Sequence, residues 1–364
     1  MTGVLLINLG TPDSPRPRDV RRYLREFLSD GRVLDIHPVA RWLLLHAVIL
    51  PFRPRRSAAA YEKIWRADGS PLLVFGRALR DAVAQELGDG FRVELGMRYG
   101  SPSIADALAA LREAQVSQLV VLPLFPQYSA AVTGSVLART FADLVESWDL
   151  PAVHVAEPFY EHPAFIDAYA ATAREPLAGF RADHVLFSYH GLPERQIRRS
   201  VPESGGCLTR PECCDAISSD NQRCYRAQCF ATTRALARAL ALPQEMQSVA
   251  FQSRLGRTPW IEPYTDKVLP ELARHGVKRL AVLCPAFVAD CLETLEEIGI
   301  RAREQWRDAG GEELLLVPCP NAHPTWVAGV SRLVREGLPA QSASSSRAAT
   351  LPDSIASGTE TPAR

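Results

Sequence analysis

Short apolar runs recur along the chain, and longer stretches with apolar residues every three to four positions separate them. The short runs predict buried strands, and the longer periodic stretches predict amphipathic helices. The predicted strands are Val4–Leu9, Arg92–Gly96, Leu119–Leu124, Ala152–Ala156, His184–Tyr189, Ser248–Gln252, Arg279–Cys284 and Glu313–Val317. The predicted helices are Arg18–Leu28, Pro71–Leu87, Ile104–Ala114, Phe141–Ser147, Phe165–Arg174, Cys229–Ala241 and Ala289–Ile298. This alternation indicates parallel sheets covered by helices.

Three features of the first half of the chain recur in the second half in the same order. Two are strand ends that close in Gly- and Pro-containing turns, and the third is an apolar run. The pairs are Leu5–Pro12 with Leu186–Pro193, Met97–Pro102 with Ser253–Pro259, and Leu119–Pro123 with Leu280–Pro285. Repetition in a fixed order indicates a duplicated unit. We therefore predict an α/β protein of two similar Rossmann-like domains, with a ligand cleft between them.

The domain boundaries follow from this repeat and from composition. The first domain is predicted to contain residues 1–155 and a returning C-terminal helix at about residues 312–338. The second domain is predicted to span residues 156–311, with a cysteine-rich insertion at about residues 200–229. Residues 339–364 are rich in Ser, Ala, Thr and Pro and lack periodic apolar positions, so we expect them to be disordered.

Composition and charge exclude several classes of protein. Lys plus Arg and Asp plus Glu both number 41, so there is no electrostatic case for a nucleic-acid partner. No apolar run reaches the roughly 18 residues of a membrane span. The first strand begins without a preceding basic segment, which argues against a signal peptide. We expect a soluble, cytoplasmic protein.

One strongly apolar segment, Val39–Phe52, is followed by Arg53, Arg55 and Arg56. It is too short to span a bilayer. A core helix is the default expectation for such a segment. The alternative is an exposed lip that makes peripheral contact with a membrane or touches an apolar substrate.

A histidine lies at the end of one predicted strand. The apolar run Val185–Phe187 continues to His190 and stops at a turn that contains Gly191 and Pro193. Open α/β folds bind ligands at the carboxyl ends of their strands. The near-neutral pKa of a histidine suits proton transfer or metal ligation. The alternative is a strand-end histidine that only hydrogen-bonds a loop.

Three carboxylates are predicted to lie near the same sheet edge. On a helix over Ala289–Ile298, Asp290, Glu293 and Glu297 would share one face. This helix follows a predicted strand directly, so its first turn is expected at the edge that carries His190. A carboxylate row facing a histidine could conduct protons or hydrated cations into an apolar cleft. An ordinary amphipathic helix would show the same pattern.

Five of the eight cysteines fall within 23 residues, which is too dense for core packing. A chain of this length does not suggest a disulfide scaffold, so we expect a local metal site in a reducing compartment. Four thiolates could hold a [2Fe–2S] cluster or a zinc ion. The five candidates are Cys207, Cys213, Cys214, Cys224 and Cys229. The isolated cysteines, expected to be structural, are Cys284, Cys291 and Cys319.

Seven motifs, in this order, together resemble the ferrochelatase family over about Val4 to Leu338. The motifs are Asn8–Pro12, Gly69–Leu72, Met97–Tyr99, Pro126–Ser129, Ser188–Pro193, Phe251–Asp266 and Phe287–Leu295. The resemblance implies the class II chelatase fold and an enzyme, a lyase, that inserts Fe²⁺ into protoporphyrin IX to form heme.

The resemblance also implies roles for individual residues. His190 and Glu293 correspond to the catalytic pair that meets the substrate Fe²⁺, and Asp290 and Glu297 would continue an acidic path. The residues expected to bind the porphyrin are Arg98, Tyr99, Tyr128 and Ser129. By analogy with relatives that carry clusters, the cysteines favour [2Fe–2S] over zinc.

Two departures from the family pattern bear on this interpretation. Cys291 replaces the histidine of the usual Asp-His-Leu/Ile-Glu-Thr motif. Asp13 stands where relatives that act on coproporphyrin often have a tyrosine, which favours protoporphyrin IX. The alternatives are a coproporphyrin or cobalt-type chelatase, or a non-catalytic heme or iron–sulfur sensor. The presence of both His190 and Glu293 argues against the sensor. A monomer and a homodimer are both compatible with the sequence.

Overall fold

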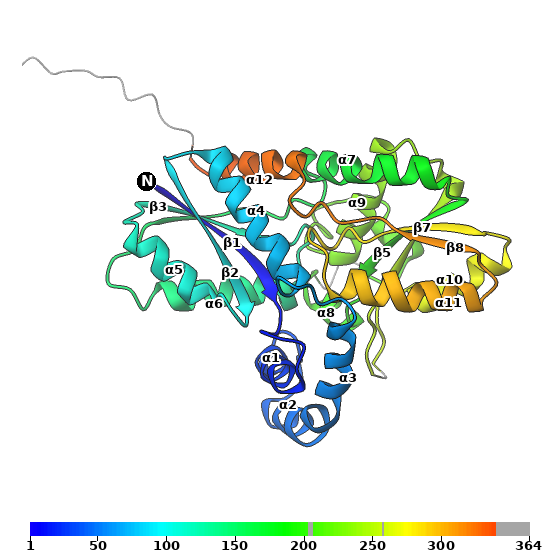
Figure 1. Cartoon of the computed structure of the whole chain (residues 1–364), viewed down its shortest axis with the longest axis horizontal. Helices are drawn as coiled ribbons and strands as arrows, with labels where there is room; N and C mark the ends of the chain where they lie inside the picture. The colour runs from blue at the N-terminus through cyan, green and yellow to red at the C-terminus, as the bar shows by residue number, and fades with distance from the viewer. Residues whose placement is uncertain (203–206, 257, 340–364) are drawn as a thin grey trace, which may run out of the picture.

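Two four-stranded parallel sheets lie side by side at the centre of the molecule (Figure 1). The structure is a computed structural model that describes residues 1–202, 207–256 and 258–339. Residues 340–364, part of the tail expected to be disordered, lie outside the described residues. The strands are β1 (Thr2–Gly10), β2 (Phe91–Tyr99), β3 (Gln118–Pro123), β4 (Ala152–Val155), β5 (His184–His190), β6 (Gln247–Gln252), β7 (Arg279–Leu283) and β8 (Glu313–Leu316).

The two sheets have the same strand order, β2-β1-β3-β4 and β6-β5-β7-β8. Each pair of repeated sequence features maps to equivalent strands, β1 with β5, β2 with β6 and β3 with β7. All eight predicted strands are present, and the expected α/β fold with two similar domains is confirmed.

Helices cover both faces of the sheets, and all seven predicted helices overlap an observed helical segment. The helices are α1 (Pro17–Ser29), α2 (Pro38–Leu43), α3 (Leu50–Glu62), α4 (Pro71–Leu87), α5 (Ile104–Glu113), α6 (Ser135–Leu144), α7 (Pro163–Phe180), α8 (Glu194–Arg199), α9 (Tyr225–Ala239), α10 (Thr265–Arg274), α11 (Arg303–Asp308) and α12 (Pro324–Glu336). Shorter or wider helical segments are η1 (Leu44–Ile49), η2 (Ala130–Gly134), η4 (Pro211–Cys214), η5 (Gln244–Met246) and η6 (Glu293–Ala302). Helix α10 was not predicted, because Pro270 interrupts its sequence pattern.

One continuous core joins the two domains. Strands β1 and β5 contribute Leu6 and Phe187, and helices α7 and α12 contribute Phe165 and Trp326. Helix α12 packs on α4 and α7, above both sheets in Figure 1. The sequence analysis predicted that the chain returns to the first domain at about residue 312, and this boundary needs correction. Strand β8 pairs with β7 in the second sheet, so the chain returns only with α12.

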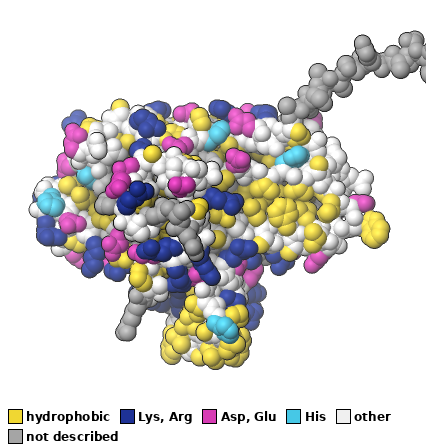
Figure 2. Space-filling view, turned by 180° about the vertical axis from the view of Figure 1, so that it is seen from behind, with side chains coloured by type: hydrophobic (Ala, Val, Ile, Leu, Met, Phe, Trp, Pro, Cys, Tyr) yellow, Lys and Arg dark blue, Asp and Glu magenta, His cyan; other side chains and the backbone are white. Residues whose placement is uncertain are grey.

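The segment α1–α3 forms a separate lobe beneath the sheets (Figure 1). Figure 2 shows hydrophobic side chains gathered at the tip of this lobe. Trp42 is 59% exposed and Phe52 is 76% exposed, whereas Leu45 and Leu50 are buried. The default expectation of a core helix is therefore wrong for Val39–Phe52, and the segment is an exposed lip. The segment is apolar on all sides, but only one side can pack against α1 and α3.

Within the part of the chain that the structure describes, no helix is both long and apolar enough to cross a bilayer.

Asp35 attaches the lobe to the second domain. Its carboxylate is 7% exposed and accepts hydrogen bonds from Arg195 Nε at 3.0 Å and Gln196 Nε2 at 3.1 Å. Burial raises the pKa of Asp35, but the bonds and charge of Arg195 and the bond from Gln196 outweigh it, so the pKa lies below its ordinary value. The charged form therefore stabilises the attachment.

We predict that Asp35→Asn lowers the free energy of unfolding by about 1 to 2 kcal/mol at neutral pH. Because the folded-state pKa is depressed, this stabilisation is present above the unfolded-state pKa and is lost as pH falls through the folded-state value. Urea unfolding should thus show a difference between variant and wild type that narrows below about pH 4. Asp68→Asn, which removes an exposed pair with Arg66, is the control and should change little. A pH-independent difference would contradict the prediction.

Candidate active site

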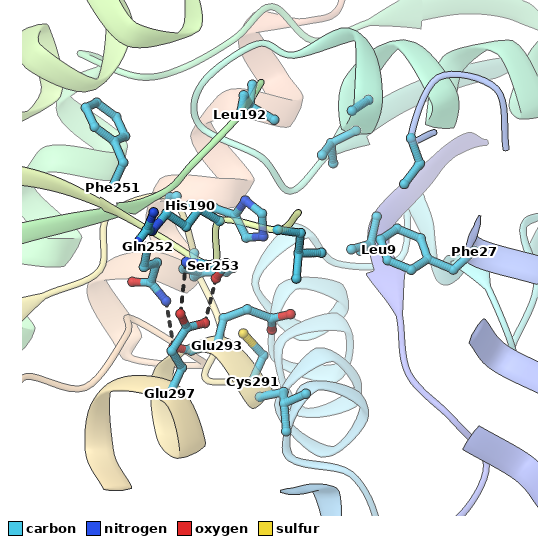
Figure 3. A pocket seen from close by; sticks show the side chains of 18 of the residues that line it. Leu9, Phe27, His190, Leu192, Phe251, Gln252, Ser253, Cys291, Glu293 and Glu297 are labelled. Atoms are coloured by element: carbon cyan, nitrogen blue, oxygen red, sulfur yellow. Dashed lines mark hydrogen bonds between the residues drawn. The ribbon is translucent and has the colours of Figure 1, made fainter. Parts of the chain in front are cut away.

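A cavity of about 1160 Å³ opens between the two sheets and the lobe. Its walls are mostly apolar, as in cavities that bind organic ligands. The lining comes from the ends of β1, β5 and β6, from the lobe, and from the start of η6 (Figure 3). The cavity therefore lies at the carboxyl ends of the strands, where the α/β architecture predicts a ligand.

His190 is the last residue of β5, and its ring points into this cavity (Figure 3). Its Nδ1 lies 2.7 Å from the Gly191 carbonyl oxygen. Because a carbonyl oxygen can only accept a hydrogen bond, Nδ1 carries a proton, and in the neutral ring Nε2 presents the lone pair. The His190 carbonyl in turn accepts a hydrogen bond from Tyr225 Oη at 2.8 Å. The structure thus places His190 where its imidazole can take a proton or bind a metal ion.

Glu293 lies beside His190, and Figure 3 shows both side chains projecting into the same space. The main chain of Glu293 is held by Gln252, whose Nε2 donates to the Glu293 carbonyl at 2.8 Å. Gln252 Oε1 accepts from Ser188 Oγ at 2.8 Å, and Ser188 lies two residues before His190 on β5. A single buried glutamine therefore connects the strand of the histidine to the helix of the glutamate.

Glu297 lines the same cavity one turn along η6. Its carboxylate accepts hydrogen bonds from Ser253 N at 2.9 Å and Ser253 Oγ at 2.5 Å. Ser253 has a φ of 67°, an uncommon conformation for a residue with a side chain. The loop after β6 is thus held in a strained conformation that orients Glu297.

Asp290 is not placed as the sequence predicted. The helix expected over Ala289–Ile298 begins instead at Glu293, so Asp290 precedes it. Its side chain is 5% exposed and lies outside the cavity wall. Its carboxylate accepts hydrogen bonds from Thr294 and Asn321. The helical wheel that put three carboxylates on one face therefore holds only for Glu293 and Glu297.

Of the four residues expected to bind the porphyrin, the structure places only Ser129 on the cavity wall. Arg98 and Tyr99 both bond the Asp30 carboxylate, from Arg98 Nη2 at 2.8 Å and from Tyr99 Oη at 2.9 Å. The Tyr128 ring lies under the Arg223 guanidinium at 5.3 Å. The side chains of Arg98, Tyr99 and Tyr128 therefore lie outside the cavity wall in this structure.

Lobe residues that the sequence analysis did not assign to the site also lie on its wall, among them Tyr23, Arg53 and Tyr61. Burial raises the pKa of Tyr61, and the negative charge of Glu293 raises it further. Burial lowers the pKa of Arg53, and the charge of Glu293 opposes this effect. Glu293 therefore lies within electrostatic reach of the lobe. An arginine directly after an apolar segment is a visible sequence feature, and Arg53 is such a residue. The sequence alone did not show that Arg53 would lie on the cavity wall.

Comparison with known proteins agrees with this geometry. The family model described as Ferrochelatase matches residues 1–338. A ferrochelatase of Coxiella burnetii (strain CbuK_Q154) is 53% identical over 336 residues, which cover 92% of this chain and 94% of the relative. A ferrochelatase of Legionella pneumophila (strain Paris) is 48% identical over 337 residues, which cover 92% and 99%. The chain belongs to the ferrochelatase family.

A solved structure, SirB from Bacillus subtilis with Fe³⁺, superposes on this member of the ferrochelatase family with a TM-score of 0.51. The sequence identity is 12%, and the match covers 92% of this chain and 95% of SirB. At this identity the likeness shows the fold alone. It confirms the expected chelatase architecture of two linked α/β units.

The side chain of Cys291, which the motif resemblance sets in place of a histidine, reaches the cavity wall beside Glu293. Burial raises the pKa of the Cys291 thiol well above its ordinary value, and the charge of Glu293 adds to the effect. The thiol is thus neutral at physiological pH and cannot supply the positive charge or the basic nitrogen of an imidazole.

The cysteine-rich insertion lies next to this ferrochelatase site. Cys207 Sγ and Cys224 Sγ are 3.8 Å apart, and Cys213 Sγ and Cys214 Sγ are 3.7 Å apart. The fifth cysteine, Cys229, is fully buried on α9, and burial raises the pKa of its thiol. The insertion therefore brings four buried or partly buried thiols together, and Cys214 also interacts with Cys224, whereas Cys229 lies on α9 outside the two closest pairs.

Proposed function

We propose that this ferrochelatase-family chain inserts Fe²⁺ into protoporphyrin IX and releases two protons, forming heme in the last step of heme biosynthesis. The observation that carries the proposal is the pairing of His190 and Glu293 inside a large apolar cavity. Membership of the ferrochelatase family supports it independently.

The reaction needs two kinds of group, and the cavity supplies both. The two pyrrole N–H protons must leave the ring as the metal enters, and the free Nε2 of His190 can accept a proton there. Fe²⁺ must lose its bound water molecules before it enters the ring. The carboxylate oxygens of Glu293 and Glu297 are suited to replace those water molecules on the ion. The apolar walls bind the macrocycle and exclude water, which strengthens these charge interactions. Glu297, one turn beyond Glu293, would extend the route for ions or protons.

The cationic groups of the wall favour a porphyrin with few carboxylates. Four arginines line the cavity, and three of them already pair with carboxylates of the protein. Those three are Arg195 with Asp35, Arg254 with Asp266 and Arg301 with Glu296. Arg53 is the lining arginine without an ion pair among the described residues. Coproporphyrin carries twice as many carboxylates as protoporphyrin, so a single available guanidinium favours protoporphyrin IX.

We predict that His190→Ala lowers kcat for iron insertion by about 100-fold or more, because no other histidine or lysine lines the cavity among the described residues. Glu293→Gln should also lower kcat strongly while the porphyrin still binds. The assay is loss of the free-porphyrin absorption bands under anaerobic conditions, with protoporphyrin and coproporphyrin compared. His275→Ala, at an exposed helix end, is the matched control. Full activity of the His190 variant would refute the catalytic assignment, and an inactive wild type would favour the sensor.

We also propose that the cysteine insertion holds a [2Fe–2S] cluster. Two thiolates on one tetrahedral metal at metal–sulfur distances of about 2.3 Å lie about 3.8 Å apart. The pairs Cys207/Cys224 and Cys213/Cys214 match this separation, one pair for each iron. The contact with Cys224 and burial raise the pKa of the Cys214 thiol, and the charge of Arg226, whose Nη1 lies 3.1 Å from Cys214 Sγ, opposes this rise.

Zinc is the second candidate for this loop, but it would need all four thiolates around one point. Among the described residues, no three or more His, Cys, Asp or Glu side chains are arranged to hold a single metal ion. The close spacing within Cys207/Cys224 and within Cys213/Cys214 fits one pair of thiolates on each of two irons.

The cysteines can be tested on anaerobically purified protein. We expect iron and acid-labile sulfide in equal amounts in the wild type, and their loss in Cys214→Ala. Cys229→Ala should retain both, because Cys229 lies on α9, outside the pairs Cys207/Cys224 and Cys213/Cys214. Zinc without sulfide, or loss of iron in the Cys229 variant only, would contradict this assignment.

The exposed lip is proposed to make peripheral contact with a membrane. Val39, Trp42 and Phe52 expose more than half of their surface, and exposed Arg55 and Arg56 follow them. An apolar tip next to arginines suits the interface of a bilayer that contains anionic lipid.

We predict that Phe52→Glu lowers binding to vesicles of phosphatidylcholine and phosphatidylserine by about tenfold or more, because burial of a phenylalanine side chain is lost. Co-sedimentation measures the bound fraction. Trp148→Glu is the control, since Trp148 is 99% exposed but lies beyond α6, away from the lobe. Equal losses in the two variants would mean that the lip is not the contact surface.

A further inference from the structure

We propose that Asp290 is a positioning residue, whose buried carboxylate fixes the start of η6 and thereby holds Glu293 in place opposite the porphyrin. This inference rests on the proposed function, and it assigns Asp290 a role other than conducting protons or cations.

The Asp290 carboxylate is at the centre of a closed set of hydrogen bonds. Oδ1 accepts from Thr294 Oγ1 at 3.0 Å and from Cys319 N at 3.4 Å. Oδ2 accepts from Asn321 Nδ2 at 2.7 Å, and Asp290 N donates to Asn321 Oδ1 at 2.8 Å. Asp290 and Asn321 are therefore joined in both directions, and both carboxylate oxygens are engaged.

These partners connect two parts of the chain that meet behind the site. Cys319 and Asn321 lie in the crossing between β8 and α12, and Asn321 N donates to Val288 O at 2.8 Å. Thr294 is fully buried in the first turn of η6 and follows Glu293 directly. Its Oγ1 also accepts from Cys291 N at 3.1 Å. The carboxylate thus fastens the residue next to Glu293 to the crossing segment.

Gln252 holds the same point from the opposite side, since it donates to the Glu293 carbonyl. Glu293 is therefore held at its own carbonyl by Gln252 and at the next residue by Asp290. A π-helical segment such as η6 has a wider turn than an α-helix, and such turns are frequently found at functional sites. The hydrogen bonds from Gln252 to Glu293 and from Thr294 to Asp290 explain how the first turn of η6 keeps a defined geometry.

The surroundings of Asp290 do not suit conduction. Its side chain is outside the cavity wall, and no ion pair involves it among the described residues. Its neighbours include the buried Tyr169, Cys284 and Cys319, whose pKa values burial and the charge of Asp290 raise. They are therefore neutral at physiological pH. A buried carboxylate is costly unless its oxygens are hydrogen-bonded, and here they are.

The experiment compares Asp290→Asn with two substitutions of its neutral partner, Thr294→Val and Thr294→Ser. Thr294 has no carboxylate to bind a cation or to take up a proton, so a role in which Asp290 itself conducts ions predicts near-normal activity for both Thr294 variants. The positioning role predicts that Thr294→Val lowers kcat about tenfold or more with little change in the KM for Fe²⁺. A Glu293 carboxylate displaced from its catalytic position would make metal insertion slower. Thr294→Ser keeps the hydroxyl and should restore kcat to near the wild-type value.

The double variant, Asp290→Asn with Thr294→Val, gives a second test. Because the two residues act through one hydrogen bond, its loss of kcat should be no larger than that of the more impaired single variant. Additive losses, or an Asp290→Asn variant whose main defect is a raised KM for Fe²⁺, would overturn the inference.

Amide hydrogen exchange of residues 293–297 supplies a readout that does not depend on activity. Exchange should be faster in Thr294→Val than in wild type and unchanged in Thr294→Ser. Equal exchange in the wild type and the Val variant would overturn the inference. If the wild type inserted no metal, the proposed function would fail, and the exchange measurement would still decide whether the contact positions η6.

Discussion

The site depends on how two segments distant in sequence are held together by the side chain of Gln252. It reaches from β6 to the Glu293 carbonyl on one side and to Ser188 of the His190 strand on the other. Both bonds are buried, so a side chain that could not complete them would leave a carbonyl or a hydroxyl without a partner. The relative placement of the histidine and the glutamate is therefore a property of the sheet itself rather than of a mobile loop.

Duplication of the α/β unit explains why a large cavity exists at this place. The carboxyl ends of β1 and β5 occupy equivalent positions in their sheets, and each strand ends in a Gly-containing turn. At Gly10, where φ is +119°, a Cβ atom would lie 1.8 Å from the Tyr99 carbonyl oxygen. The turn after β1 thus requires glycine at this position. The lobe then closes the space with Arg53 and Tyr61.

The cysteine insertion is adjacent in sequence to a residue of the cavity wall. Cys224 precedes α9, and Tyr225, the first residue of that helix, donates to the His190 carbonyl and lines the cavity. The loop that gathers the thiols and the wall that holds the histidine thus meet at adjacent residues. A change in the conformation of the insertion could therefore shift Tyr225 and, through its hydrogen bond, the end of β5 at His190.

The sequence by itself determined the parallel α/β architecture, the duplication, and the place of His190 at a strand end. These depend on local apolar periodicity and on Gly and Pro turns, which short stretches of chain encode. Only the tertiary structure decided that Asp290 lies behind the wall while Glu293 lies on it. The helix begins at Glu293, where contacts from Gln252 and the β8–α12 crossing meet, and no local pattern records those contacts. The same holds for the lip, whose exposure depends on how much of it α1 and α3 can cover.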